Sequence, residues 1–341
     1  MSPGADLRVA VAGSTGYIGM QCVALLAGHP GVHLSGVMAR SHAGERYGDV
    51  VPGSTVDLRI DDSLAPDSAD VVFSALPHTV AAAHAREWLS AGAVVIDLSA
   101  DFRLRDPVAY QRWYGVEHLA PDLCGESVYG LVELHRGELA RADLIAVPGC
   151  YPTATLLACA PALSAGLVEP KIVVDAKSGV SGAGRSVQLS TQFAEVNESV
   201  HAYGVSGHRH KSEMLEQLNG LGDGEVHLTF VPHLLPMTRG ILVTAYMTPK
   251  PGITPQAVQE TYAAFCAGQP FLREHSAPPA TKTVTGTNLA ALHAGWQDGT
   301  TVVTVAIDNL LKGAAGQAVQ AFNVRFGFDE QMALPVTSQW P

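Results

Sequence analysis

A glycine-rich loop between an apolar run and a helical segment constrains the fold of this chain more than any other feature. The run LRVAVA at residues 7–12 is β-branched and apolar, and MQCVALLAGHP, after the loop, has the pattern of a helix. Glycines at such a turn let the backbone approach a pyrophosphate, whose charge the helix N-terminus offsets. A glycine-rich surface turn is the alternative, but the flanking strand and helix favour a nucleotide site. We therefore expect cofactor contacts from the loop GSTGYIG, namely Gly13, Ser14, Thr15, Gly16, Tyr17, Ile18 and Gly19.

The second expected strand, VHLSGVMA at residues 32–39, ends at Arg40 and Ser41. A site specific for NAD normally has an acidic residue at this place, where it binds the ribose hydroxyls. A guanidinium beside a hydroxyl suits the 2′-phosphate of NADP instead, which a carboxylate would repel. Arg40 therefore favours NADP(H) as the cofactor, against the alternative of an ordinary exposed arginine after a strand.

Two further strand–helix pairs continue the alternation and predict a parallel α/β sheet. They are DVVFSA followed by LPHTVAAAHAREWLSAG, and AVVIDL followed by SADFRL. Leu76 and Pro77 follow the first of these strands, where ligands bind in open α/β sheets, so we expect them beside the cofactor. Arg103 follows the second and could bind a substrate anion or form a structural ion pair. Residues 106–140 lack clean periodicity and predict an irregular cover.

The segment VPGCYPTA at residues 147–154 indicates a second functional turn. The apolar run LIAV ends at Pro148 and Gly149, and Cys150 opens a long small-residue stretch that contains TATLLACAPAL. This pattern predicts a strand that leads into a helix with Cys150 at the helix N-terminus. The unpaired amides there lower the pKa of a thiol and favour the nucleophilic thiolate. The alternative is that Cys150 is a small buried hydrophobic residue.

The segment GHRHKSEMLEQLNG supplies a candidate partner for this cysteine. His208 and His210 stand just before an amphipathic helical pattern that contains Glu213. Their spacing is not the i, i+4 spacing of a helical zinc pair, and no third ligand stands at motif spacing, so we expect no metal site. Histidine can serve as acid and as base near neutral pH, so His210 is the candidate acid/base for a cysteine nucleophile.

The second half of the chain predicts an α+β domain. The runs KIVVDA, VHLTFVPHL, GILVTAYMT and TTVVTVAIDN indicate strands of a mixed sheet with helices on one side. The exposed face of this sheet could pair with another subunit. The loop after the first run places Lys177 and Arg185 around glycines, as an anion-binding nest or as a flexible basic loop. A helical spacing from Leu310 to Phe322 allows the chain to return to the first domain.

Composition limits the classes of partner. A chain of 341 residues with 47% hydrophobic and 16% charged residues is long enough for two well-packed domains. Its net charge of −11 disfavours nucleic acid and anionic membranes as partners. Five cysteines without CxxC spacing fit a reducing cytoplasm better than a disulfide framework or a zinc site. We expect no export signal and no membrane span, because the apolar segments are interrupted by Pro or Gly.

Several motifs together resemble the N-acetyl-gamma-glutamyl-phosphate reductase family. They are GSTGYIG, LSADFRL, VPGCYPTA, GHRHKSE, PHLLPMTRGI and DNLLKGAAGQAVQ, in the family's order from about residue 7 to about residue 328. The GCYPTA and HRH segments are the specific ones, whereas related aspartate-semialdehyde dehydrogenases have their cysteine in an N-C motif. The family's HRH segment is usually followed by a Pro before the Glu. Here Lys211 and Ser212 stand between His210 and Glu213 instead.

The resemblance implies the NADPH-dependent reduction of a small acyl phosphate to a semialdehyde in arginine biosynthesis, by a cytoplasmic homodimer or homotetramer. It implies a Rossmann-type NADP-binding domain at residues 1–149, joined by a C-terminal helix at 312–341. Residues 150–311 would form a catalytic and oligomerisation α+β domain of the semialdehyde dehydrogenase type.

The resemblance also assigns roles to single residues. Cys150 becomes the nucleophile and His210 the acid/base. The supporting or substrate-binding candidates are His208, Glu213, Arg103, Lys177 and Arg239, and Asn309 joins the residues around NADPH.

Two alternatives remain open from the sequence. A sister reductase that acts on carrier-protein-bound aminoadipyl or glutamyl phosphate shares the motif set, although an acidic chain does not favour docking of an acidic carrier. A non-enzymatic NADP-binding regulator could use Cys150 to sense oxidants, but it would leave His210 without a role.

Overall fold

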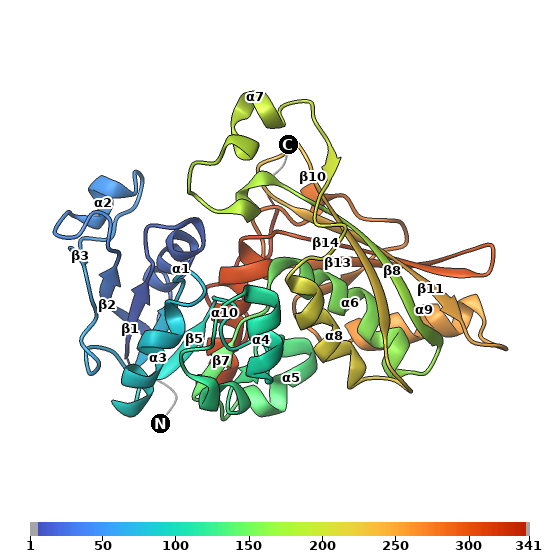
Figure 1. Cartoon of the computed structure of the whole chain (residues 1–341), viewed down its shortest axis with the longest axis horizontal. Coiled ribbons are helices and arrows are strands. Elements are labelled where there is room, and N and C mark those ends of the chain that lie inside the picture. The colour runs from blue at the N-terminus through green and yellow to red at the C-terminus, as the bar shows by residue number, and fades with distance from the viewer. Residues whose placement is uncertain (1–5, 339–341) are drawn as a thin grey trace. The chain divides into compact units, whose positions relative to one another are not determined.

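A computed structural model of the chain describes residues 6–338 (Figure 1). It divides into two compact units, the first Met1–Pro148 with Ala314–Leu334 and the second Gly149–Gly313 with Pro335–Pro341. The sequence assigned residues 312–341 to the first domain, whereas residues 335–338 belong to the second unit. The amide of Asn288 donates to the Pro335 carbonyl oxygen at 2.8 Å, which ties this segment to unit 2.

Unit 1 is built on a seven-stranded sheet, counted over residues 6–338, in the order β3-β2-β1-β4-β5-β7-β6. Every neighbouring pair is parallel, and the strand order reverses direction between β1 and β4. This arrangement confirms the predicted Rossmann-type sheet. The strands are β1 (Leu7–Ala12), β2 (Val32–Met38), β3 (Ile60–Asp61), β4 (Val71–Ser74), β5 (Val94–Asp97), β6 (Val128–Tyr129) and β7 (Leu144–Ala146).

Helices cover this sheet, and one of them comes from the end of the chain. The final helix, α10, packs against α1 and α5, and Asn323 on α10 shares a 2.9 Å hydrogen bond with His29. The helices of unit 1 are α1 (Tyr17–Ala27), α2 (Tyr47–Val50), α3 (Ala81–Ser90), α4 (Pro107–Tyr114), α5 (Val132–Leu139) and α10 (Gly316–Phe326), and a single π-helical turn at Leu311–Ala315 precedes α10.

The prediction of an irregular cover at residues 106–140 is wrong. This stretch contains α4, a 3₁₀ turn at Pro121–Gly125, the edge strand β6, and α5. Local signals set the ends of α4. The Asp106 side chain accepts from the Val108 amide at 2.9 Å, Pro107 occupies the first turn, and Gly115 ends the helix in the left-handed region. Only Tyr110 of α4 is buried, so its apolar periodicity is weak.

Unit 2 contains a second seven-stranded sheet, again counted over the described residues, in the order β12-β13-β14-β11-β8-β10-β9. The pairs β8–β10 and β12–β13 are parallel and the others are antiparallel, which confirms the predicted mixed sheet. The strands are β8 (Val168–Ser178), β9 (His201–Ala202), β10 (His227–Leu234), β11 (Ile241–Pro249), β12 (Leu272–Glu274), β13 (Ala290–Gln297) and β14 (Thr300–Ile307).

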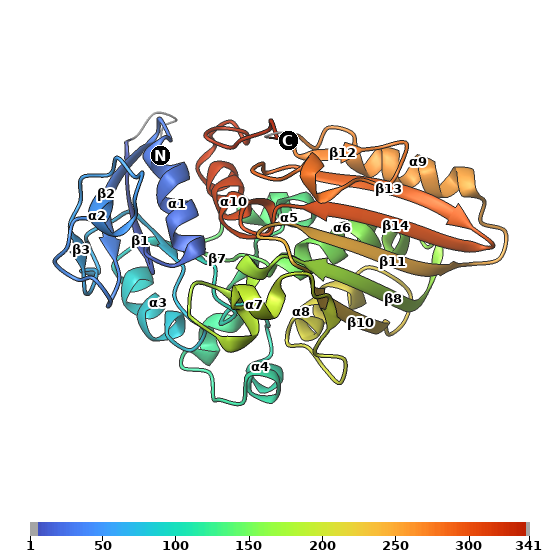
Figure 2. The same ribbon diagram turned by 90° about the horizontal axis from the view of Figure 1, so that it is seen from above.

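Three helices of unit 2 lie on one face of this sheet, as Figures 1 and 2 show from two directions. They are α6 (Cys150–Ser164), α8 (His210–Asn219) and α9 (Pro255–Cys266). Helix α6 is buried all round from Tyr151 to Leu163, as its small apolar residues predict. Short turns at Val180–Ala183, Leu189–Thr191 and Thr281–Thr283, and the four-residue α7 (Phe193–Val196), lie in the connections.

The opposite face of the sheet has a different character. On β8, the residues Ile172, Val174 and Ala176 are buried, while the alternate residues Val173, Asp175 and Lys177 are more exposed. Because side chains alternate along a strand, these three point away from the helices. We call this the helix-free face, defined by Val173, Asp175 and Lys177 on β8 and Tyr246 on β11. Within residues 6–338, no helix is long and apolar enough to cross a bilayer.

Candidate active site

The glycine loop between β1 and α1 has a geometry that only glycine permits at two positions. Gly13 has φ +78°, and a Cβ there would lie 2.4 Å from the Ala75 carbonyl oxygen at the end of β4. A Cβ on Gly19 would lie 2.1 Å from the carbonyl oxygen of Gly13. The loop is therefore pressed against backbone on both sides, at the point where the strand order of the sheet reverses. That point is where open α/β sheets bind their ligands.

The loop and the start of α1 fit the phosphates of a dinucleotide. Gly16 caps α1 with no side-chain hydrogen bond, and the first turn contains no acidic residue. The amides at such a helix start attract an anion. Ser14 is the exception among the predicted contacts, since its hydroxyl is buried and donates to the Met38 carbonyl oxygen at 3.1 Å. The other predicted residues, Thr15, Tyr17 and Ile18, line the same turn.

Arg40 and Ser41 are exposed and follow the end of β2. Across residues 6–338, the Arg40 guanidinium makes no hydrogen bond or ion pair with the protein. Leu76 is half-buried and Pro77 exposed, and both come directly after Ala75, against which the glycine loop packs. The predicted cofactor residues of unit 1 thus lie at the ends of β1, β2 and β4, on neighbouring strands of one sheet.

Cys150 is the first residue of α6, as predicted, and its side chain is half-buried. The approach of residue 313 restricts this turn: a Cβ on Gly313 would lie 2.8 Å from the Cβ of Cys150. Sequence reasoning missed Gly313, although it stands in the DNLLKGAAGQ motif. Two other cysteines differ sharply, because complete burial raises the pKa of Cys22 and Cys159 to about 12. Those two are inert, whereas Cys150 has the helix N-terminus and the access that a nucleophile needs.

Glu213 links the Cys150 turn to α8. Its carboxylate is buried and accepts from the backbone amide of Gly149 at 2.9 Å. His210 is the first residue of α8, one turn before Glu213, and residues three apart share a face of a helix. Helices α6 and α8 also pack together, so His210 lies on the helix that this bond joins to the Cys150 turn.

An aromatic cluster completes the surroundings of Cys150. The ring of Tyr151 contacts the rings of His208, His210 and Phe230, with centroids 5.8, 6.1 and 5.4 Å away. The hydroxyl of Tyr203 donates to that of Tyr151 at 3.0 Å, and burial raises the pKa of both phenols. Tyr203 and Phe230 were not predicted. No motif marks them, because they stand in unrelated segments that only the fold brings together.

The surroundings of His208 keep its ring neutral. The Nδ1 of His208 accepts from the His210 amide at 3.2 Å, so the proton of a neutral His208 is on Nε2. Burial, reinforced by the charge of Arg209, lowers the pKa of His208 to about 4. His208 is therefore neutral at physiological pH and positions the start of α8, which leaves His210 as the candidate acid/base.

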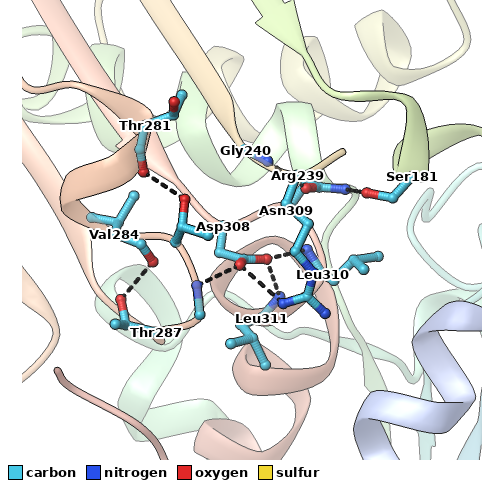
Figure 3. A network of polar contacts seen from close by, with 12 residues as sticks. Ser181, Arg239, Gly240, Thr281, Val284, Thr287, Asp308, Asn309, Leu310 and Leu311 are labelled. Atoms are coloured by element: carbon cyan, nitrogen blue, oxygen red, sulfur yellow. Dashed lines mark hydrogen bonds and ion pairs between the residues drawn. The ribbon is translucent and has the colours of Figure 1, made fainter. Parts of the chain in front are cut away.

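Asn309 and Arg239 belong to a polar network that fixes the loops around them (Figure 3). The side-chain oxygen of Asn309 accepts from the backbone amide of Gly240 at 2.8 Å, and its side-chain nitrogen donates to the Ser181 hydroxyl at 2.9 Å. Arg239 pairs at 3.2 Å with Asp308, which is fully buried. Asn309 and Arg239, both predicted to bind ligands, therefore form hydrogen bonds or an ion pair with other residues of unit 2.

Arg103 and Lys177 also have protein partners. Arg103 is buried and donates to the carbonyl oxygens of Val147 and Leu98 at 2.8 and 2.9 Å. Lys177 forms an ion pair with Asp175 on the helix-free face, opposite the face that α6 covers. Their predicted roles in binding substrate remain predictions. In the part of the chain from residue 6 to residue 338, no cluster of His, Cys, Asp and Glu is arranged to hold a metal ion.

Two family models match the two units. Residues 8–142 match the semialdehyde dehydrogenase NAD binding domain, and residues 150–309 match the semialdehyde dehydrogenase dimerisation domain. N-acetyl-gamma-glutamyl-phosphate reductases from Desulforudis audaxviator and Azotobacter vinelandii are each 46% identical to this chain. The first alignment covers 98% of this chain and 100% of the relative, and the second covers 96% and 98%. The chain belongs to the N-acetyl-gamma-glutamyl-phosphate reductase family.

Solved structures extend this result for the fold of the reductase. Aspartate semialdehyde dehydrogenase II of Vibrio cholerae matches with a TM-score of 0.71 at 16% identity, over 94% of this chain and 98% of that chain. The enzyme from Candida albicans, solved with NADP, also matches with a TM-score of 0.71, at 14% identity over the same shares. The reductase is thus an oxidoreductase with a dinucleotide-binding domain and a dimerisation domain of the semialdehyde dehydrogenase type.

Proposed function

We propose that this protein reduces N-acetyl-gamma-glutamyl phosphate to N-acetyl-glutamate 5-semialdehyde and phosphate, with NADPH, in arginine biosynthesis. The observation that supports it most is Cys150 at the N-terminus of α6, in a cluster that contains His210 and Glu213. A thiol nucleophile with an acid/base partner suits acyl transfer from an activated acyl group. The choice of substrate is supported by the relatives at 46% identity over nearly the full chain, which are named N-acetyl-gamma-glutamyl-phosphate reductase.

NADPH fits the unit 1 loop for the reasons already given. Gly13 and Gly19 let the loop pack closely against backbone, and the start of α1, which has no acidic residue in its first turn, attracts the charge of a pyrophosphate. Arg40 and Ser41 would bind the 2′-phosphate, and Leu76 and Pro77 would contact the nucleotide beside the loop. When bound, NADPH supplies a hydride to the acyl carbon.

The first chemical step belongs to Cys150. Its thiolate, favoured by the positive end of α6, attacks the carbonyl carbon of the acyl phosphate. A carbon–sulfur bond forms, the carbon–oxygen bond to phosphate breaks, and inorganic phosphate leaves with the electron pair. The product is a thioester on Cys150, which is more readily reduced than a carboxylate.

His210 serves the second step. Hydride addition turns the thioester carbonyl into a thiohemiacetal oxyanion, which takes its proton from His210. Collapse of the thiohemiacetal then returns this proton to His210, releases the aldehyde and restores the Cys150 thiolate. Neutral His208 and the carboxylate of Glu213 position the two reacting groups, through the His210 amide and the Gly149 amide.

We also propose that the working form is a homodimer, or a homotetramer built from it, in the cytoplasm, where thiols stay reduced. The dimerisation-domain match spans residues 150–309, which include the whole helix-free face. That face exposes Val173 and Tyr246, which are 40% and 41% accessible among residues 6–338. A second copy placed on it would bury both.

An assay of NADPH oxidation tests the substrate. Freshly generated N-acetyl-gamma-glutamyl phosphate should support turnover, with kcat/KM at least about a hundredfold above that of a carrier-protein-bound aminoadipyl phosphate. The reverse preference would assign the chain to the sister reaction. No turnover with either, alongside tight NADPH binding, would favour a non-enzymatic regulator.

A further inference from the structure

One segment of unit 2 exposes an unusual amount of apolar side chain. The connection between β8 and α8, residues 179–207, holds five large apolar residues that are 61–89% exposed, which are Val187, Leu189, Phe193, Val200 and Val205. We call this segment the excursion. Figure 1 shows it around α7, in yellow-green, on the side of the strands away from α6 and α8.

The exposure is concentrated in this segment. In the rest of the described part of unit 2, the large apolar side chains that are exposed are Val173 at 40% and Tyr246 at 41%, both on the helix-free face, and Val336 at 40%. Phe193, by contrast, is 82% exposed and Val187 is 89% exposed. Scattered apolar residues are ordinary on a surface, but a group of them in one short segment marks an interaction site.

The inner end of the excursion reaches the surroundings of Cys150. Tyr203 donates from its amide to the Pro232 carbonyl oxygen at 3.0 Å, and from its hydroxyl to that of Tyr151 at 3.0 Å. Its ring also contacts the ring of His208, with centroids 5.8 Å apart. Tyr203 therefore connects the excursion to Tyr151, the residue next to Cys150.

We propose that the excursion docks on a second copy of this chain, and that docking holds Tyr203 against Tyr151. Two observations identify the occupant. The whole excursion lies inside the 150–309 dimerisation-domain match. Its strand β9 also pairs with β10 at His233 and Leu234, so it forms the edge of the sheet that has the helix-free face. The docking surface is thus continuous with the face that we assign to the subunit interface.

The consequence for the reaction rests on the proposed function. Without the second copy, the exposed segment loses its support and Tyr203 is held by one edge of β10 alone. The Tyr203–Tyr151 bond then breaks more often, and the rings of Tyr151 and His208 lose their fixed places beside Cys150. The assembled form is therefore the more active one.

The double variant V187D/F193E tests the docking. Both side chains are exposed, so the fold of the subunit should persist, as judged by circular dichroism and thermal unfolding. Sedimentation velocity from about 0.1 to 50 µM should show a subunit dissociation constant raised at least about tenfold. The kcat should fall by a similar factor at low protein concentration and recover as concentration rises. L189D gives a second, independent variant if the first is unstable.

V108D is the matched control. Val108 on α4 is 70% exposed but lies outside the 150–309 match. The subunit dissociation constant and the kcat of V108D should therefore equal those of the unsubstituted protein. An excursion variant that keeps its full assembly and shows only a raised KM would overturn the proposal in favour of a lid over the same subunit's site. Unchanged assembly and kinetics, or an unsubstituted protein that is monomeric at 50 µM, would overturn it too. The sedimentation result stands even if the acyl phosphate is not the substrate.

Discussion

The two candidate sites of this molecule are built in opposite ways. The glycine loop of unit 1 is made of backbone, and a methyl group at Gly19 is excluded because its carbon would lie 2.1 Å from the Gly13 carbonyl oxygen. The Cys150 site of unit 2 is made of side chains from three segments, namely Cys150 and Tyr151, residues 203–213, and Phe230. A site made of closely packed backbone excludes any added side-chain atom. A site made of side chains can accommodate a change of shape, but its activity depends on the functional groups that those side chains carry. Substitutions should therefore separate binding from catalysis.

The largest effect should come from C150S. A hydroxyl occupies less volume than a thiol but is a far weaker nucleophile here, so kcat should fall by at least about a thousandfold. The dissociation constant for NADPH, measured by fluorescence titration, should stay within about twofold of the original, because the loop is untouched. Retained turnover would remove Cys150 from the chemistry.

The next effect should come from H210N, which removes the proton donor. We expect kcat to fall by roughly two to four powers of ten, with NADPH affinity unchanged. Stopped-flow measurement of hydride transfer checks this directly. A silent H210N together with a large loss in H208N would reverse the two assignments.

H208N serves as the partner variant because its expected signature is a stability effect. The folded-state pKa of His208, about 4, lies below the ordinary value of 6.5. Between these values the unfolded chain binds a proton that the folded chain does not, so His208 makes stability fall as pH drops from 6.5 towards 4. In H208N this part of the pH dependence should vanish from urea melts, at a cost in kcat smaller than that of H210N.

The backbone site should respond to G19A in binding rather than in chemistry. A methyl group there must displace the Gly13 carbonyl, so the dissociation constant for NADPH should rise by about tenfold or more, which is 1.4 kcal/mol or more. At saturating NADPH much of kcat should remain. G28A is the control, because a Cβ at Gly28 would lie 3.8 Å from its nearest neighbour, the Leu25 carbonyl oxygen. Equal effects of G19A and G28A would contradict the steric account.

The most confined effect should come from R40D, which changes cofactor selectivity alone. A carboxylate repels the 2′-phosphate and can accept ribose hydroxyls, so the ratio of kcat/KM for NADPH over NADH should fall roughly 10- to 100-fold. R46A is the control, since Arg46 is also exposed but pairs with Asp57 at 2.9 Å. An unchanged ratio in R40D would place the phosphate site elsewhere.

The same contrast explains how much the sequence could predict. The loop from Gly13 to Gly19 and the start of α6 at Cys150 are local features. Tight turns and helix starts depend on residues that are neighbours in the chain, so they can be recognised as short sequence motifs. The turn before α1 and the start of α6 lie where the sequence predicts them, and the roles of their residues stay predictions. His210 and Glu213 were found because they share one turn of one helix.

Tyr203, Phe230 and Gly313 could not be found in this way. Each reaches the Cys150 turn, or its neighbour Tyr151, from a distant segment, and tertiary packing alone sets that approach. Conversely, Arg103 and Lys177 have the charge of an anion site, but the fold gives each a protein partner. A charged residue type shows what a side chain can bind, and only the three-dimensional neighbourhood shows what it does bind.

The covalent intermediate on Cys150 is the most direct test of the proposed chemistry. Stoichiometric enzyme mixed with N-acetyl-glutamate 5-semialdehyde and NADP, without phosphate, should release a burst of NADPH no larger than the number of active sites. The peptide that contains Cys150 should gain the mass of the acyl group, and added phosphate or arsenate should restore steady turnover. Absence of both burst and adduct, or steady turnover without an acyl acceptor, would contradict the thioester.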